Sequence, residues 1–399
     1  MSYKWTEYTV EQLVQLGMLD PPMDGNHGAI HPKTSDYVDD GVPFVMANDL
    51  SNGTVNFDSC ARITEAQAKT LRKGFSRPGD VLLTHKATIG RTAIVPEVFP
   101  TIILTPQVTY YRVRRGISNR FLKYYFDSPT FQKVFNNWAG SGSTRAYLGI
   151  TAQRKLPIVL PPLSVQEKIA QILGSLDDKI ELNNRINENL LQQAQALYKD
   201  RFVDMQPFDG EMPADWHLGT VSEIIELHDS KRIPLSSRER ANLAKVYPYY
   251  GATSVMDYVD RYLFDGIYLL LGEDGTVVDS KGFPILQYVE GKFWVNNHAH
   301  IITGKNGFTV ETLYLLFSLT NVQSIVTGAV QPKISQANLN KVPVIIPSKA
   351  ELSAFDSIAQ PIFAQIRNLR AENDRLAAIR DTLLPRLMSG ELDVSDIDL

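Results

Sequence analysis

The chain has 399 residues, of which 44% are apolar and 21% are charged, and a single cysteine, Cys60. This length and composition predict two globular units and exclude collagen-like, disordered and disulfide-stapled proteins. The formal net charge of −4 excludes a uniformly basic nucleic-acid binder, although residues 62–155 contain 16 lysines and arginines against 4 acidic residues. Polyanion binding and a merely solvated face are the two interpretations of this basic stretch.

No targeting or membrane segment is expected. The first 19 residues include Glu7 and Glu11, and no later segment has an uninterrupted apolar run of about 18 residues. One cysteine suits a reducing compartment. We therefore expect a cytoplasmic protein without a membrane partner.

The globular segments predict a mixed α/β (α+β) fold. Strands are expected at residues 80–84, 91–95 and 108–113, followed by short helices at 118–127 and 130–135. In the second half, strands at 267–271, 293–295 and 299–302 precede a helix at 310–318. The same order of elements in both halves indicates an internal pseudo-repeat.

Self-comparison supports this repeat. The pattern of residues 156–161 recurs at 342–347, an offset of 186 residues that continues without gaps into the following segment. Near the start of each copy, Trp5 matches Trp216 at an offset of 211 residues. A duplicated module is therefore a better prediction than one large domain.

Each copy ends in apolar residues spaced three and four apart, which predicts a long helix. Ser164 and Glu167 form a Ser-x-x-Glu pattern that predicts a capping box at the start of the first helix, which should run to about Phe202. Pro361 should kink the second helix or delay its start, and this helix should end near Pro385.

The two apolar stripes predict that the helices pair lengthwise as an antiparallel coiled coil between two similar globular domains. The alternative is that each helix covers only its own domain. The residues expected at the pairing seam are Ile169, Ile172, Leu176, Ile180, Leu190, Leu197, Ile358, Ile362, Ile366, Leu369, Leu376 and Leu383.

Three fragments invite an enzymatic interpretation. Residues 20–23 (Asp-Pro-Pro-Met) are similar to the (Asn/Asp)-Pro-Pro-aromatic loop of amino-methyltransferases, but Met23 replaces the aromatic ring. Residues 138–142 follow a predicted helix, whereas a glycine-rich cofactor loop follows a strand. Asp279, Ser280 and Lys281, close to two further acids, could be a nuclease metal site, but acids crowded into one turn favour a polar loop.

Other catalytic patterns are missing from the sequence. There is no Gly-x-x-x-x-Gly-Lys-(Ser/Thr) phosphate loop, so nucleotide hydrolysis is not expected. His298 and His300 share one face of a strand without a third ligand, which favours hydrogen-bonding histidines over a metal site. Cys60 is expected to be a buried thiol. We therefore expect no catalytic residue, no metal and no cofactor in this chain.

Polar side chains in glycine-containing loops fit DNA reading instead. Arg and Lys pair with guanine, Asn and Gln with adenine, and small hydroxyls with phosphates or base edges. The alternative for each residue is ordinary turn chemistry. In the first copy, the DNA-binding candidates are Arg62, Lys69, Thr84, His85, Lys86, Thr88, Arg91, Gln107, Ser141, Ser143, Thr144, Arg145 and Tyr147. In the second copy, they are Glu273, Asp274, Thr276, Lys281, Asn296, Asn297, His298, Gln331 and Lys333.

Helix length gives the expected target geometry. At about 1.5 Å per residue, a helix of roughly 35 residues is about 50 Å long, which is the length of about 15 base pairs of DNA. Two similar but unequal modules at the ends of such a rod predict a bipartite, asymmetric DNA target.

Several segments also resemble those of a known family. They are GDVLLT and TIGR at 79–84 and 88–91, LPPLSVQ leading to IAQIL within 160–173, DDKIELN at 177–183, GEDG at 272–275, GKFWVNNHAH at 291–300 and LMSGEL at 387–392. Together they resemble the specificity subunit of type I restriction-modification systems, over nearly the whole chain.

The resemblance implies a non-catalytic subunit that recognises double-stranded DNA. It implies target recognition domains, which we expect at residues 1–160 and 206–347, and long helices, which we expect at 161–205 and, with a tail, at 348–399. The implied partners are two modification (methyltransferase) subunits and ATP-dependent restriction subunits, which would hold S-adenosylmethionine, ATP and magnesium for DNA methylation and cleavage. The alternatives are a self-contained adenine methyltransferase using Asp20 to Met23, and a helical scaffold without DNA contact.

Overall fold

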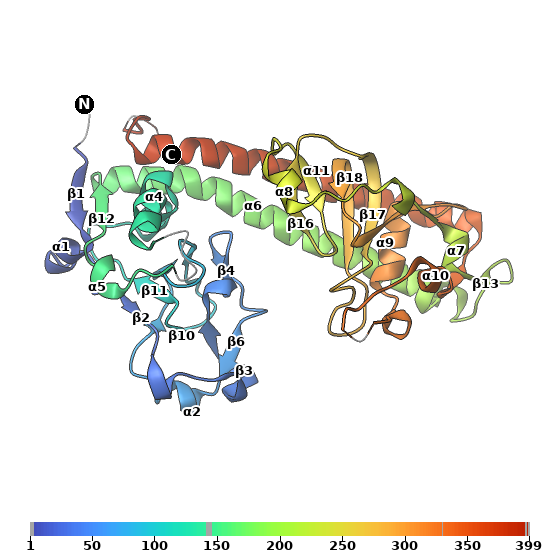
Figure 1. Ribbon diagram of the computed structural model, residues 1–399, viewed down its shortest axis with the longest axis horizontal. Coiled ribbons are helices and arrows are strands. Elements are labelled where there is room, and N and C mark those ends of the chain that lie inside the picture. The colour runs from blue at the N-terminus through green and yellow to red at the C-terminus, as the bar shows by residue number, and fades with distance from the viewer. Residues whose placement is uncertain (1–3, 141–145, 329, 396, 398–399) are drawn as a thin grey trace. The chain divides into compact units, whose positions relative to one another are not determined.

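The computed structural model describes residues 4–140, 146–328, 330–395 and 397 (Figure 1). The chain forms two compact units: unit 1 comprises Met1–Glu181 and Glu372–Leu399, and unit 2 comprises Leu182–Ala371. Two long helices, α6 (Leu163–Tyr198) and α11 (Lys349–Met388), contribute one part to each unit. Unit 1 is therefore assembled from two separate parts of the chain.

Unit 1 contains two four-stranded sheets, ordered β6-β3-β10-β7 and β2-β11-β8-β9. Its strands are β1 (Thr6–Thr9), β2 (Met23–Asp24), β3 (Tyr37–Val45), β4 (Leu50–Ser51), β5 (Thr54–Val55), β6 (Ala61–Ile63), β7 (Phe75–Ser76), β8 (Val81–Thr84), β9 (Thr92–Ile94), β10 (Ile102–Leu104), β11 (Val108–Tyr111) and β12 (Pro157–Leu160). Its short helices are α1 (Val10–Gln15), α2 (Glu65–Ala68), α3 (Asn119–Asp127), α4 (Pro129–Trp138) and α5 (Ile150–Gln153). Every residue of β8 and β11 is buried, and α3 packs on β8 and β9.

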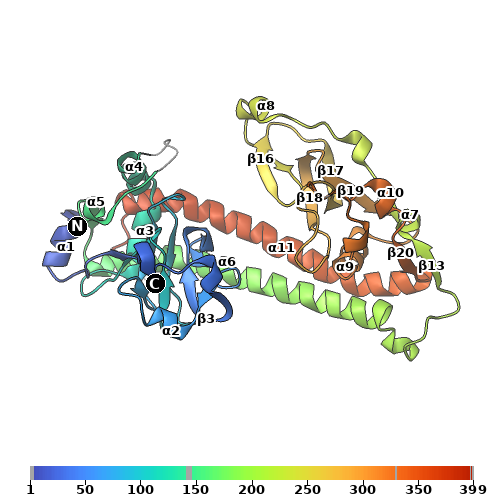
Figure 2. The ribbon, with the colours of Figure 1, turned by 60° about the horizontal axis from the view of Figure 1, so that its bottom comes forward.

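Unit 2 contains one six-stranded sheet, ordered β14-β19-β17-β18-β15-β16. Its strands are β13 (His217–Thr220), β14 (Ile225–Leu227), β15 (Tyr247–Tyr250), β16 (Val255–Val259), β17 (Phe264–Gly272), β18 (Leu286–Val295), β19 (Ala299–Gly304) and β20 (Pro343–Ile346). Its short helices are α7 (Val221–Ile224), α8 (Ser237–Ala241), α9 (Val310–Ser318) and α10 (Gln336–Leu339). Helix α9 packs against β17, β18 and β19 and is tied to α11 through Thr309, whose hydroxyl bonds to Asp356 at 2.9 Å (Figure 2).

The predicted strands and short helices are present, with boundaries one to three residues from those expected for most of them. The helix predicted at 310–318 has the same boundaries as α9. The strand expected at 267–271 is longer, since β17 begins at Phe264. It continues because Phe264 to Leu271 pair with β18 in an antiparallel ladder.

The backbone confirms the internal repeat. In unit 1, β1 pairs with β12 in an antiparallel ladder that joins Thr6 to Leu160, and in unit 2, β13 pairs with β20 in the same way. The following residues match as well, because Val10 N donates to Leu156 O at 3.1 Å and Val221 N donates to Val342 O at 2.9 Å. Leu156 and Val342 are the pair related by the 186-residue offset in the sequence.

The two long helices pair in an antiparallel manner within each unit. In unit 1, Ile169 and Leu173 of α6 share a buried cluster with Leu387 of α11. Asp177 on α6 accepts hydrogen bonds from Tyr124 Oη at 2.6 Å and from Arg380 Nη1 at 2.7 Å, so it ties α3 and α11 to α6.

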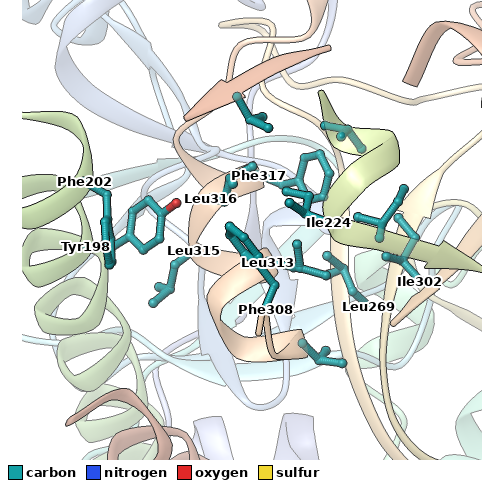
Figure 3. Packing of buried hydrophobic residues seen from close by; sticks show 14 of the residues in the cluster. Tyr198, Phe202, Ile224, Leu269, Ile302, Phe308, Leu313, Leu315, Leu316 and Phe317 are labelled. Carbon is teal, nitrogen blue, oxygen red and sulfur yellow. The ribbon is translucent and has the colours of Figure 1, made fainter. Parts of the chain in front are cut away.

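In unit 2, Tyr198 of α6 packs against Phe355 of α11 with ring centroids 5.6 Å apart. Figure 3 shows how α9 links this contact to the sheet: Leu315 lies toward Tyr198, while Leu313 lies toward Leu269. One buried cluster therefore includes both helices and the sheet of this unit.

Two of the residues expected at the seam lie outside it. Leu197 and Ile358 are 41% and 45% exposed. The neighbouring Tyr198 and Ala359 are buried instead, because one residue turns a helix by about 100° and moves a side chain to another face. Of the others, Ile169, Ile366 and Leu369 are buried, and the remainder are half-buried: Ile172, Leu176, Ile180, Leu190, Ile362, Leu376 and Leu383.

Two helix expectations need correction. Helix α6 begins at Leu163, so Ser164 lies within its first turn and is not the capping residue; Gln166 Nε2 donates to Pro161 O at 2.9 Å at this end. Helix α11 begins at Lys349 and continues through Pro361, which therefore does not delay its start. Proline removes one backbone hydrogen bond from the helix, and the side chains of Ala359 and Phe363 on either side of it, each 1% exposed, pack this segment in the core.

Candidate nucleic-acid interface

The turn between β8 and β9 begins with two buried residues. Thr84 Oγ1 accepts a hydrogen bond from Arg91 N at 2.9 Å. His85 is fully buried, its N–H donates to Gln107 O at 2.9 Å, and its carbonyl accepts from Leu148 N at 3.0 Å. Burial lowers the pKa of His85 to about 4, so the ring is neutral at pH 7. The expectation that the Thr84 and His85 side chains contact DNA is therefore wrong, because they anchor the turn from inside.

The rest of this turn faces solvent. Ala87 (φ 65°) and Gly90 (φ 83°) adopt left-handed backbone conformations that let the chain reverse between the strands. Lys86 and Arg91 are exposed, and Thr88 is half-buried. Arg91 is held by a 3.0 Å hydrogen bond to a backbone carbonyl, whereas the Lys86 ammonium has no partner in the described part of the chain. The turn therefore presents positive charge.

A cavity of about 300 Å³ lies beside this turn. Its lining residues are His27, Gly28, His31, Tyr37, Met46, Lys86, Thr105, Pro106 and Gln107. Gln107 Oε1 accepts a hydrogen bond from Ala47 N at 3.3 Å, which leaves its amide NH₂ as the group that is not held. Thr105 Oγ1 is buried and has no hydrogen-bond partner among the described residues. Lys86 and Gln107 therefore offer polar groups to this cavity, whereas the Thr105 hydroxyl is buried in its wall.

A buried carboxylate lies behind the cavity. Asp24 accepts a hydrogen bond from His27 Nε2 at 2.9 Å and contacts the Lys73 ammonium. Burial raises the pKa of Asp24, but the hydrogen bonds from Lys73 and His27 outweigh it and leave the pKa below its usual value. This ionised side chain holds the loop that contains His27 against Lys73.

The remaining candidates of the first copy lie in several places. Tyr147 is 49% exposed and bridges by its backbone to Lys86. Arg62 in β6 donates to Gly41 O at 3.3 Å and lies over the Phe99 ring, and Lys69 is exposed at the end of α2, so these two belong to the region of the other four-stranded sheet. The candidates Ser141, Ser143, Thr144 and Arg145 lie outside the described residues.

In unit 2, the turn after β17 brings four candidates together. Glu273 Oε1 lies 3.3 Å from Lys333 Nζ, and Glu273 Oε2 lies 2.5 Å from Arg232 Nη1. Asp274 forms a backbone bridge with Lys333, and its carboxylate lies 3.6 Å from His298 Nδ1. Glu273, Asp274, His298 and Lys333 therefore meet at one surface, as Lys86, Gln107 and Tyr147 do in unit 1.

Asp229, Glu273 and His300 form a group with ligand-type atoms within 4.8 Å of one another. The Arg232 guanidinium already lies between the acids, 2.5 Å from Glu273 and 3.4 Å from Asp229. The two His300 ring nitrogens face Asp229 Oδ2 at 2.6 Å and Ile334 O at 2.8 Å. Burial raises the pKa of Asp229, but the hydrogen bond with His300 and further contacts leave it lowered. The Arg232 guanidinium thus compensates the charge of these acids, and His300 is a hydrogen-bonding residue.

The other candidates of the second copy have mixed settings. Asn296 is buried and its Oδ1 accepts from His298 N at 2.8 Å, so it shapes the loop rather than facing solvent, contrary to its expected contact with DNA. Lys281 lies in a turn closed by Asp279, which accepts from Lys281 N and Phe283 N at 2.8 and 2.9 Å. This is the polar turn favoured over a nuclease site. Thr276, Asn297 and Gln331 are exposed.

The comparison with known proteins decides the family. The sequence profile of the Type I restriction modification DNA specificity domain matches residues 4–192 and again residues 213–379. The chain belongs to this family. The two matches correspond to the two copies of the repeat.

Individual relatives agree. The chain is 26% identical, over 92% of its length and 90% of the relative's, to the Type I restriction enzyme MjaIX specificity subunit of Methanocaldococcus jannaschii. It is 24% identical, over 59% of its length and 69% of the relative's, to the Type I restriction enzyme HindI specificity subunit of Haemophilus influenzae. The crystal structure of the type I restriction-modification system S subunit from M. genitalium has the same fold, with a TM-score of 0.55 and 16% identity over 97% of this chain and 96% of that one.

The two specificity domains share one backbone frame at the candidate surface. The pair His85 N to Gln107 O (2.9 Å) in unit 1 corresponds to Glu273 N to His298 O (2.8 Å) in unit 2. The bridge between Lys86 and Tyr147 likewise corresponds to the one between Asp274 and Lys333. Equivalent backbone positions therefore carry different side chains.

The same backbone frame places Thr105, which the sequence analysis did not select, at the position of Asn296. Thr105 N donates to Val45 O, and Asn296 N donates to Tyr250 O, each at 3.0 Å, in the equivalent place. Thr105 and Asn296 are therefore equivalent positions, and both side chains are buried. No signal in the sequence exists for His27 and His31, since their loop is reached only through the fold.

Asp20, on which the methyltransferase alternative depends, and the single cysteine have structural roles. Both Asp20 carboxylate oxygens accept hydrogen bonds from Arg114 at 2.8 Å, which lowers the Asp20 pKa. Burial raises the pKa of Cys60 to about 12, which makes it an unreactive thiol.

Among the described residues, no helix combines the length and apolar character needed to cross a membrane.

Proposed function

We propose that this chain is the DNA sequence-recognition subunit of a type I restriction-modification complex and is not itself a catalyst. The observation that carries the proposal is the double match to the specificity-domain family, joined to one backbone frame that presents different side chains in each copy. Two recognition domains with different side chains bind two different half-sites, so the target is bipartite and asymmetric. The relatives named above are specificity subunits of such enzymes.

We assign the two target recognition domains to residues 1–160 and 206–347, and the partner-docking helices to residues 161–205 and 348–399. The helices carry exposed apolar side chains outside their pairing seam, among them Leu182, Ile358 and Ile379 at 51%, 45% and 48% exposure. Such side chains favour contact with other proteins. Two modification subunits, which use S-adenosylmethionine, would dock there, and restriction subunits would supply ATP- and magnesium-dependent cleavage. We infer that the chain is cytoplasmic, as part of a complex acting on cellular DNA.

The test is binding of the chain, assembled with its modification subunits, to a library of duplexes with two random half-sites and variable spacing. The expected result is enrichment of one split sequence, with affinity that falls steeply as salt rises. Enrichment of no sequence would refute the proposal. A helical scaffold without DNA contact would show no affinity for duplex DNA at any salt concentration.

Charge reversal locates the surface. Lys86→Glu with Arg91→Glu should weaken binding in unit 1, because both cations face solvent at the turn after β8. The matched control is Lys305→Glu, an exposed lysine just beyond β19 at the end that adjoins Ile224, away from the turn after β17. Equal losses in both proteins would contradict the placement of the surface.

A further inference from the structure

The equivalent turns of the two domains present hydrogen-bonding groups of opposite character. In unit 1, Lys86 follows His85, whose backbone N–H donates to Gln107 O. In unit 2, Asp274 follows Glu273, whose backbone N–H donates to His298 O. Lys86 also forms a backbone bridge with Tyr147, and Asp274 forms one with Lys333. The backbone thus places a cation in one domain where it places a carboxylate in the other.

In unit 1, the available groups at this position are donors. The Lys86 ammonium has three N–H groups and no acceptor, and no described residue pairs with it. The Gln107 carbonyl oxygen is held by Ala47 N, so the amide NH₂ is the part of Gln107 left for a ligand beside Lys86. This surface therefore fits a ligand edge that accepts hydrogen bonds.

In unit 2, the group at the position equivalent to Lys86 is an acceptor, the Asp274 carboxylate, and the donors His298 and Lys333 lie beside it. Glu273 is held by Arg232 and Lys333, and only 12% of its side chain is exposed. Among the residues that the structure describes, His298 is the one side chain near the Asp274 carboxylate, at 3.6 Å, and 23% of the Asp274 side chain is exposed. The Asp274 carboxylate has no donor of its own when ionised, so this surface fits a ligand edge that donates.

Base edges in the major groove have these two characters. Guanine presents the acceptors N7 and O6, and cytosine presents the N4 amino group, which Asp and Glu accept. We propose that Lys86, with Gln107, reads a guanine in the half-site bound by unit 1 and that Asp274 reads a cytosine in the half-site bound by unit 2. This assignment rests on the proposed DNA-recognition function.

The experiment compares the enriched split sequences of four complexes assembled with the modification subunits: the wild type, Lys86→Glu, Asp274→Lys and the control Lys305→Glu. In Lys86→Glu, the preference for guanine at one position of the first half-site should be lost or become a preference for cytosine. In Asp274→Lys, a cytosine of the second half-site should be replaced by guanine. Each change should leave the other half-site unaltered, and the lost discrimination should be about 5- to 150-fold.

A third substitution, Lys86→Met, keeps an unbranched side chain one atom shorter and removes the donor, so it should lose the guanine preference without gaining another. A variant that binds all sequences more weakly but keeps the wild-type base preferences would show a phosphate contact and overturn the assignment. An unchanged enriched sequence would also overturn it, while the proposed function would stand. Absence of any enriched sequence with the wild-type complex would instead refute the proposed function.

Discussion

Asp177 joins α3 of unit 1 to both long helices, and Asp177→Asn tests that coupling. Its carboxylate accepts hydrogen bonds from Tyr124 at 2.6 Å and Arg380 at 2.7 Å, and Lys123 Nζ lies 3.5 Å away. Hydrogen bonds to charged groups contribute about 1.5–3 kcal/mol and neutral ones about 0.5–1.5 kcal/mol. Tyr124 bonds to Oδ2 and Arg380 to Oδ1, whereas Asn has a single acceptor oxygen. Asp177→Asn therefore loses one of these bonds and weakens the other, which should lower the free energy of unfolding by about 2–3 kcal/mol.

The assay is urea unfolding of the full chain, with Asp178→Asn as the matched control. Asp178 is the next residue on α6, and its ion pair with Arg120 is about half exposed on both sides. Exposed pairs contribute about 0–1 kcal/mol, so this variant should differ little from wild type. Equal effects of the two substitutions would refute the coupling of α3 to the helices through Asp177.

The pH dependence gives an independent check. Burial raises the pKa of Asp177, but Lys123, Tyr124 and Arg380 together leave it lowered. A lowered pKa means that ionised Asp177 stabilises the fold above the unfolded value of about 3.9, and that this stabilisation is lost as the pH falls through the folded value. The difference between wild type and Asp177→Asn should therefore shrink below about pH 4.

Three further outcomes are expected. Gly25→Ala should destabilise the chain by about 1–3 kcal/mol in urea unfolding, because the new Cβ would lie 1.9 Å from the Leu104 carbonyl oxygen; wild-type stability would contradict that packing. Cys60, with its pKa raised to about 12, should react with a thiol reagent at pH 8 only as fast as the chain opens, and rapid labelling of the folded chain would argue against its burial. Since the folded pKa of His85 is lowered to about 4, protonation of the unfolded state removes stability as the pH falls from about 6.5 to 4. His85→Gln should therefore gain up to about 3 kcal/mol relative to wild type over that range, measured by urea unfolding, and a constant difference would refute a neutral buried ring.

The repeated order of elements follows from local sequence. The apolar runs at 81–84 and 267–271 and the spacing of the helical stripes depend on side chains a few residues apart, so the strands and both long helices could be predicted. The 186-residue offset then indicates that the copies share an architecture, as the ladders of β1 with β12 and β13 with β20 confirm.

The details of the candidate surface depend on contacts between distant residues. His85 appears in the sequence as a polar loop residue, yet Gln107 and Leu148 hold it inside the domain. Thr105 comes next to Lys86 only because β10 and the turn after β8 line the same cavity. Leu197 shows a similar limit for the helices. The apolar spacing predicts that one face of the helix is buried, but not that Tyr198, and not the adjacent Leu197, occupies it.

The discontinuity of unit 1 has a consequence for synthesis on the ribosome. Unit 2 is one continuous segment, Leu182–Ala371, whereas unit 1 needs Glu372–Leu399 to complete its core, where Leu387 and Val394 are buried. At about 5–20 residues per second, translation delivers that last segment on the order of ten to forty seconds after Glu181. The first domain to be translated is therefore the last to be finished, and until then its nascent hydrophobic surface is exposed to chaperones.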